Sequence, residues 1–329
     1  MRIEKTVQDI LEILIRHELG PGQYARYLQQ DEKQSRVMGL NPYGCADAAN
    51  ILYTLGYLPE DPELRFACVE TLQQFQDPET GLFYEGTHHT YHTTAHCIAA
   101  LELFDAQPLY PLKDQERYLD PKALASFLES LPWDESPWNS AHRGAGLYAS
   151  LVITRTADAK WRRAYFDWLE VHNDPVTGLG IERDEDKAPL FHQLNGWFHY
   201  LFNFGHAHEP IPHPEQVIDS CIRLYDEHAL AEHFGQEIDL SEIDWIYTMN
   251  RTSRQTDYRF HEVKDRIADM ASIYIPWIQA QDPKTCDRMN DLHLLFGAVT
   301  ALAELQDALP GEIETEIPLR NVLDRRPFI

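Results

Sequence analysis

The chain has few basic residues and no long apolar run. Its 329 residues include 28 lysines and arginines against 53 aspartates and glutamates, which gives a formal net charge of −25. No basic run is present that would follow a phosphate backbone, so we expect neither nucleic acid nor an anionic membrane surface as a partner. No apolar stretch approaches about 18 residues, and residues 1–7 lack the pattern of a secretory signal. We therefore expect neither a membrane span nor export.

Cysteine and strand signals are also sparse. The five cysteines are scattered, odd in number and form no C-x-x-C pair, which is typical of reduced, mostly buried thiols in a cytoplasmic protein. No convincing run of alternating apolar and polar residues predicts a strand. The fold class that remains is all-α.

What the chain does have is a repeat. At intervals of about fifty residues, a cluster of polar residues opens a helix of small apolar residues. The six openings lie at residues 41–47, 88–92, 138–143, 192–195, 242–245 and 290–293. Repeats of this length share one continuous core with their neighbours, so we expect residues 1–329 to form one domain.

A second set of helices, with ordinary amphipathic spacing, alternates with the first. Its members are expected at residues 3–14, 64–72, 120–131, 161–171, 214–225 and 260–281. The polar-headed helices are apolar almost all round and should be buried, which leaves the amphipathic set as an outer layer. Twelve alternating helices predict a closed double ring of six hairpins. Pro276 should kink or interrupt the last outer helix, and residues from about 307 to 329 should form a tail laid over the surface.

The connectors repeat as well, and they carry a resemblance. Residues 76–83 and 173–180 are near copies built on Asp-Pro and Thr-Gly, and residues 281–286 are a degenerate third copy. The order of helix, Gly-containing turn and His-x-Thr-Ala helix at residues 76–95 resembles the repeats of α/α-toroid proteins. That superfamily includes terpenoid cyclases, protein prenyltransferases, glycoside hydrolases, polysaccharide lyases and sugar epimerases. The resemblance implies an (α/α)6 toroid whose ligand lies in a funnel at the N-terminal ends of the inner helices.

Histidines recur at the polar openings. His92, His142 and His192 share one repeat position, and His293 lies one residue from the same phase. Imidazoles around one funnel suit general acid–base chemistry or hydrogen bonds to hydroxyls. We assign no metal ligands and no cofactor, although the pairs His88/His92 and His92/His96 have the i, i+4 spacing of a zinc site, which keeps a metal as an alternative.

Two aspartates complete the catalytic set. Asp47 and Asp244 lie in apolar segments, where an unpaired carboxylate is costly. Glu85 and Asp291 are acidic candidates that could equally be helix caps. The catalytic prediction is therefore Asp47, His92, His142 and Asp244. Aromatic, amide and cationic side chains near the same rim are predicted to bind substrate: Tyr43, Tyr91, Trp138, Asn139, Arg143, His192, Asn195, Arg251, Asp291 and His293.

These residues favour an enzyme that acts on an oligosaccharide. A hydrolase would use Asp47 and Asp244, and a lyase would use Tyr91 or His92 with an arginine at a uronate carboxyl. An epimerase would use His92 and His192 across the ring. We rank these in that order.

Other classes stay as alternatives. The Asp-x-Asp-Asp motif of a terpenoid cyclase is missing, since residues 184–186 read only as a loop charge run. The zinc residues of a prenyltransferase have only a loose counterpart in Cys286, Asp287, Asp291 and His293. A non-enzymatic ring that binds a basic peptide is a further alternative, and the oligomeric state is open.

Overall fold

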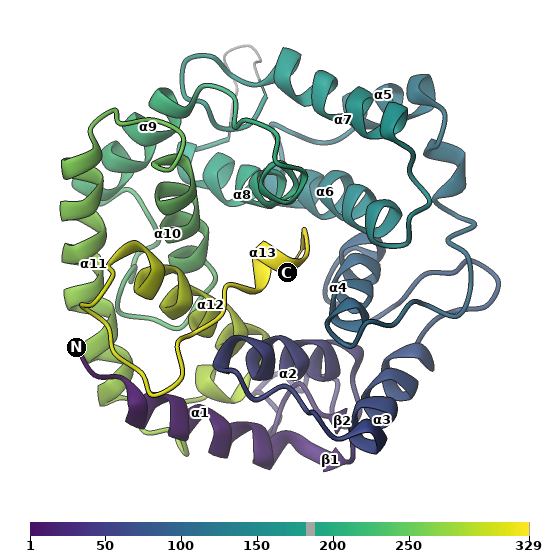
Figure 1. The fold of residues 1–329 in the computed structure, drawn as a ribbon, viewed down its shortest axis with the longest axis vertical. Helices are drawn as coiled ribbons and strands as arrows, with labels where there is room; N and C mark the ends of the chain where they lie inside the picture. Colours follow the sequence, from purple (N-terminus) through teal and green to yellow (C-terminus); the bar gives the residue numbers. More distant parts are fainter. Residues whose placement is uncertain (182–187, 329) are drawn as a thin grey trace.

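The computed structural model describes residues 1–181 and 188–328, and within them the chain is mainly helical (Figure 1). The polar-headed helices are α2 (Pro42–Leu55), α4 (Thr90–Leu103), α6 (Pro137–Ile153), α8 (Leu190–Ala207), α10 (Ser241–Thr252) and α12 (Leu292–Ala308). The amphipathic helices are α1 (Glu4–His17), α3 (Pro62–Gln73), α5 (Pro121–Glu129), α7 (Ala159–His172), α9 (Pro214–Asp226) and α11 (Phe260–Ala280). The strict alternation of the two sets is confirmed.

The six polar-headed helices pack against one another in a closed cycle. Each contacts the next along the chain, and α12 contacts α2 to complete the cycle. Most residues of these helices are buried, including all but two of α2. Figure 1 shows the amphipathic helices at the periphery, and each of them has exposed as well as buried residues. This arrangement follows from the two sequence patterns, because only a helix that is apolar all round loses nothing by complete burial.

Local signals account for the helix boundaries. Asn41 caps α2 by accepting hydrogen bonds from the backbone N–H groups of Tyr43 and Gly44, and Pro42 occupies the first turn. The expected Asp-Pro turns are present: Asp77 and Asp174 each accept backbone N–H groups through the side chain. The glycines that close these turns, Gly81 and Gly178, have φ of 80° and 69°.

Three expectations need correction. Two short strands, β1 (Glu18–Gly20) and β2 (Gln23–Tyr24), pair antiparallel, and they are too short to produce an alternating pattern. Helix α11 continues through Pro276 to Ala280 and is not interrupted there. The 3-10 turns η1 (Glu116–Tyr118) and η2 (Arg288–Asn290) interrupt two connectors. The charge run at 184–186 lies outside the described residues.

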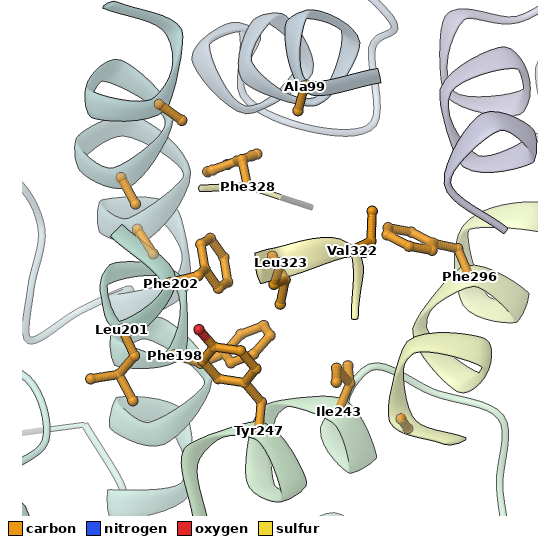
Figure 2. Close-up of a cluster of buried hydrophobic side chains, with 14 of the residues drawn as sticks. Ala99, Phe198, Leu201, Phe202, Ile243, Tyr247, Phe296, Val322, Leu323 and Phe328 are labelled. Atoms are coloured by element: carbon orange, nitrogen blue, oxygen red, sulfur yellow. The ribbon is translucent and has the colours of Figure 1, made fainter. Parts of the chain in front are cut away.

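The third correction concerns the C-terminal tail, which enters the centre of the ring instead of remaining on its surface. It contains a short helix, α13 (Val322–Arg325), and Figure 1 shows this helix inside the cycle of inner helices. Figure 2 shows Val322, Leu323 and Phe328 among side chains of α8, α10 and α12. Phe328 is completely buried. The tail therefore contributes core that the periodic part of the sequence does not supply.

The tail enters at the C-terminal ends of the inner helices. The backbone N–H of Arg320 donates to the carbonyl of Thr54 at the end of α2, and Arg325 donates to Glu102 at the end of α4 (3.0 Å). The polar openings lie at the opposite, N-terminal ends of the inner helices. Among the described residues, no helix combines the length and apolar character needed to cross a membrane. All five cysteines are free thiols, and four are buried.

Candidate functional site

Two glycines allow the N-terminal ends of the inner helices to approach their neighbours closely. A Cβ at Gly44 would lie 2.5 Å from the carbonyl carbon of Ala25, so glycine lets the segment after β2 cross α2 and places Arg26 over the ring of Tyr43. A Cβ at Gly146 would lie 2.8 Å from the carbonyl oxygen of Tyr91. Glycine there brings α6 against α4, near the polar openings of both helices.

The first result of this packing is an acidic triad formed by Asp47, His96 and His293. One carboxylate oxygen of Asp47 accepts hydrogen bonds from Nε2 of His96 (2.8 Å) and Nδ1 of His293 (3.1 Å). Asp47 and His96 are completely buried. Burial alone would favour the protonated acid, but the two imidazoles outweigh it and hold the pKa of Asp47 well below its ordinary value. Asp47 is thus a buried carboxylate that accepts hydrogen bonds from two imidazoles.

Arg26 forms a second buried ion cluster beside it. Its Nε donates to Asp291 (3.0 Å), and its terminal nitrogens reach Thr87 (2.9 Å) and Glu85 (3.4 Å). Burial opposes ionisation of Glu85, but hydrogen bonds from His88 and Thr87, together with Arg26, lower its pKa to about 2. Asp291 also caps α12 by accepting from the N–H of His293. This cluster holds the start of α12, and with it His293, in place.

The second group of histidines contains no acid. His92, His142 and His199 form an imidazole triad in which one ring nitrogen of each lies within 4.8 Å of those of the other two. The rings of His92 and His142 have centroids 4.2 Å apart. All three residues are at least 95% buried. Burial lowers the pKa of His92 and His142 well below the ordinary value, and that of His199 to about 4, so the three rings are neutral at pH 7.

A small cavity of about 20 Å³ borders both triads. Polar and aromatic side chains from five of the inner helices or their openings line it: His88, His92, Trp138, Phe198, His199, Leu240, Asp244, His293 and Phe296. Trp138 is 42% exposed and packs on His142 with ring centroids 3.9 Å apart, so the indole lies where the cavity meets solvent. Phe328 of the tail packs edge-on against His92, with ring centroids 4.8 Å apart.

Asp244 gives the cavity an acid of a different kind from Asp47. It is 96% buried, and burial, together with Asp239 and Glu242, raises its pKa well above the ordinary value. With its amide nitrogen turned toward them, Asn195 donates to the Phe191 carbonyl and to Oδ2 of Asp244, both at 3.2 Å. No imidazole or guanidinium among the described residues forms an ion pair with Asp244 that would keep it charged. Its raised pKa favours the protonated form, and its side chain lines the cavity.

Several of the predicted residues surround this cavity. His92, Trp138, Asp244 and His293 line it. Four other predicted residues contact the lining residues or the helices that carry them. The Tyr43 hydroxyl shares a 2.5 Å hydrogen bond with Nδ1 of His92, and Asp47 accepts a hydrogen bond from His293. Asp291 caps α12, and Asn195 contacts Asp244. His142 belongs to the imidazole triad. Their chemical roles stay predictions.

The remaining predicted residues lie elsewhere. Tyr91 and Arg143 line a separate surface pocket, where the Tyr91 hydroxyl donates to Asp114 (2.6 Å). Asn139 and His192 are exposed, and His192 is not part of the imidazole triad. Arg251 lies near the opposite end of α10, where it pairs with Glu304 and with Asp324 of the tail. The carboxylate-binding role expected of Arg251 in a uronate site is therefore not available to it.

Two residues of the site were not anticipated. His199 occupies the position expected of His192, two helical turns further along α8, because α8 begins well outside the cavity. The seven-residue spacing of the two histidines was a usable signal, since it places both on one face of a helix. Arg26 gave no signal, because it lies in an irregular segment whose position depends on contacts with α2 and α12.

Comparison with known proteins adds no identification. No family model matches the chain, and no curated protein or solved structure is significantly similar to it. The chemistry of the cavity is therefore the basis for any functional conclusion.

Proposed function

We propose that the chain is an (α/α)6-toroid enzyme that acts on a saccharide, with Asp244 as general acid and His293 as general base. The toroid assignment is supported by the closed cycle of inner helices and the peripheral position of the outer ones. In such a ring, a ligand would enter at the N-terminal ends of the inner helices, where Trp138 is exposed.

The observation that carries the proposal is that two groups suited to opposite proton transfers line one cavity. Asp244 lines the cavity and its pKa is raised by burial, which favours the protonated form that a general acid requires. Nδ1 of His293 donates to the Asp47 carboxylate, so Nε2 is left with a lone pair that can accept a proton. Asp47 acts as a positioning residue, because it fixes the tautomer and orientation of the imidazole.

The shape of the cavity limits how substrate binds. A volume of about 20 Å³ is too small for a sugar ring, so the saccharide would rest at the mouth and only the reacting atoms would reach inward. The exposed face of Trp138 offers a stacking surface there. We favour hydrolysis over elimination, because Arg251 pairs with Glu304 away from the cavity and no arginine of the described residues lines it to bind a uronate carboxyl.

A second candidate is a cyclase of polyprenyl substrates. Phe198, Leu240 and Phe296 line the same cavity, and a protonated aspartate among apolar side chains is suited to protonating a double bond. The missing Asp-x-Asp-Asp motif and the small volume make this candidate the weaker of the two.

The test is a thermal-shift screen with neutral oligosaccharides, uronic oligosaccharides and polyprenyl diphosphates, followed by a product assay. A ligand at a hundred times its dissociation constant should stabilise the fold by about 2.7 kcal/mol. Asp244→Asn should then lower kcat by about 100-fold or more. Glu242→Gln is the matched control, because Glu242 is also a buried carboxyl on α10 but does not line the cavity. A shift with diphosphates alone, or equal activity of the two variants, would contradict the proposal.

A further inference from the structure

We propose that His92, His142 and His199 bind one divalent transition-metal ion of the zinc type through a ring nitrogen of each. The inference rests on the geometry of the imidazole triad and does not depend on the identity of the substrate. Three histidines are a sufficient protein ligand set for zinc, and imidazole is a ligand that suits zinc, cobalt and copper.

One ring nitrogen of each histidine lies near those of the other two, and the triad contains no carboxylate to accept hydrogen bonds from them. Nε2 of His142 is buried and has no hydrogen-bond partner. A buried imidazole nitrogen without a partner is costly, because it loses its hydration and gains nothing in return. The ligand atoms lie within 4.8 Å of one another. Nitrogens bound to one zinc ion stand about 3.3 Å apart, given a bond of about 2.0 Å and tetrahedral geometry, so small side-chain rotations would close the site.

Two of the three rings are already oriented by second partners. Nδ1 of His199 donates to the carbonyl of Asn195 (3.0 Å), which leaves Nε2 deprotonated and able to ligate. Nδ1 of His92 lies 2.5 Å from the Tyr43 hydroxyl. The hydroxyl oxygen can accept a hydrogen bond from this N–H, which leaves Nε2 of His92 deprotonated in the same way. Metal-binding histidines commonly donate their other N–H to a carbonyl or another polar group, since this fixes the ring and its tautomer.

The acidic triad has a similar composition for a metal site but a different state. There Oδ1 of Asp47 already accepts hydrogen bonds from both His96 and His293, so the facing nitrogens carry protons and cannot ligate. A metal at that position would first have to displace two charge-assisted hydrogen bonds. The two triads therefore suit different chemistry. In the acidic triad the facing ring nitrogens carry protons and donate to a carboxylate, whereas in the imidazole triad they offer lone pairs to a metal ion.

The position of the imidazole triad also leaves room for a fourth ligand. His92 and His199 both border the cavity of about 20 Å³, which is large enough for one water molecule. Three protein ligands with one open position is the arrangement of catalytic rather than structural zinc.

The experiment is a Zn²⁺ titration of the full chain, without an affinity tag and after treatment with a chelator, in competition with a chromophoric chelator. Wild type should bind one tight equivalent. His142→Ala and His199→Ala should each weaken that equivalent by more than 100-fold, whereas His192→Ala, an exposed histidine on the same helix as His199, should leave it unchanged. Tyr43→Phe keeps all three ligands and should weaken binding about 10- to 100-fold. The visible spectrum of the Co²⁺ form reports four-coordinate geometry directly.

Two results would overturn the site. One is the absence of any tight equivalent in folded wild-type protein. The other is a tight equivalent that survives in His142→Ala but disappears in His96→Ala, which would place the metal at the acidic triad. Far-UV circular dichroism of each metal-free variant identifies any that fail to fold, and Tyr43→Phe then carries the test. Because the readout is binding, its failure is distinct from failure of the saccharide screen.

Discussion

The acidic triad and the imidazole triad are neighbours built largely from the same residue type, and they differ in one carboxylate. Asp47 turns His96 and His293 into hydrogen-bond donors, so that every nitrogen facing the carboxylate is used. His92, His142 and His199 have no such acceptor among them, and Nε2 of His142 is left without a hydrogen-bond partner. The acidic triad also keeps unpartnered buried atoms, but these are Oδ2 of Asp47 and Nδ1 of His96, outside the two hydrogen bonds to Oδ1. Both triads are buried to a similar degree. Burial alone therefore does not decide what a histidine does; the charge of its nearest partner does.

The carboxyls of α10 extend the comparison. Asp47, with two imidazole donors, stays ionised despite complete burial, whereas Asp244 and Glu242 lack such donors and their pKa values rise. Desolvation penalises the charged form in all three cases, so the difference comes from the partners. Burial to a similar degree therefore leaves the pKa of one carboxyl lowered and raises the pKa values of the other two.

The largest effect is expected from removing the carboxylate of Asp47, which distinguishes the acidic triad from the imidazole triad. Asp47→Ala should lower the free energy of unfolding by about 3–5 kcal/mol, because it leaves two buried imidazoles without their acceptor. The pKa of Asp47 is depressed in the folded protein, so its stabilising effect is present above the unfolded pKa and is lost as pH falls through the folded value. Urea denaturation at pH 7 measures the first effect, and its continuation down to pH 3 measures the onset of the second. A loss below about 1 kcal/mol would contradict the acidic triad.

A metal should stabilise only one of the triads. Adding Zn²⁺ at a hundred times its dissociation constant to metal-free protein should raise the free energy of unfolding by about 2.7 kcal/mol. The gain should vanish in His142→Ala and persist in His96→Ala, relative to each variant without metal. Thermal denaturation with and without Zn²⁺ provides the measurement, and Mg²⁺ serves as the control ion. Equal gains in both variants would show that the ion binds elsewhere.

The carboxyls without imidazole partners should show the opposite pH dependence. Burial raises the pKa of Glu242 from 4.5 to about 7, so its stabilising effect is complete below the unfolded value and is lost as pH rises through the folded one. Wild type should lose up to about 3 kcal/mol of stability from this group between pH 4.5 and 7. Glu242→Gln should flatten that part of the profile. Denaturation curves at several pH values test it, and an unchanged profile would refute the assignment.

The smallest expected effect is a difference in coupling. A double-mutant cycle on Asp47 and His293 should give an interaction energy of about 1–2 kcal/mol, because the two side chains share a charge-assisted hydrogen bond. The same cycle on His92 and His142 in metal-free protein should give no more than about 0.5 kcal/mol. Zn²⁺ should raise the second value and leave the first unchanged. Coupling of similar size in both cycles without metal would remove the distinction between the triads.

Much of the fold follows from local patterns in the chain. The fifty-residue repeat, the alternation of apolar and amphipathic helices and the Asp-Pro turns all appear where they are expected, because each depends on residues close in sequence. The tail was misplaced for the converse reason. Val322, Leu323 and Phe328 have no periodic neighbours, and their burial depends on a hole in the centre of the ring that only the assembled helices create.

The residues of the candidate site also fall into those that local sequence patterns predicted and those that only the fold brings into the site. Asp47, His92, His142, Asp244 and His293 were recognisable because each lies in a repeated opening. His199 and Arg26 were not, since one depends on how far α8 extends beyond the cavity and the other on a close approach of two backbones at Gly44. Arg251 was recognised as polar but assigned to the wrong end of its helix, because a spacing along the chain does not say which end of the ring a side chain faces.

By itself, the sequence determined a mainly helical chain with polar residues at the starts of its buried helices, because helix periodicity and capping act within a few residues. Only the tertiary structure decided which histidines meet a carboxylate and which meet one another. That choice depends on helix rotation and on contacts between residues up to 246 positions apart, such as His293 and Asp47. In a buried site those contacts set the charge of each group, and the charge sets the chemistry.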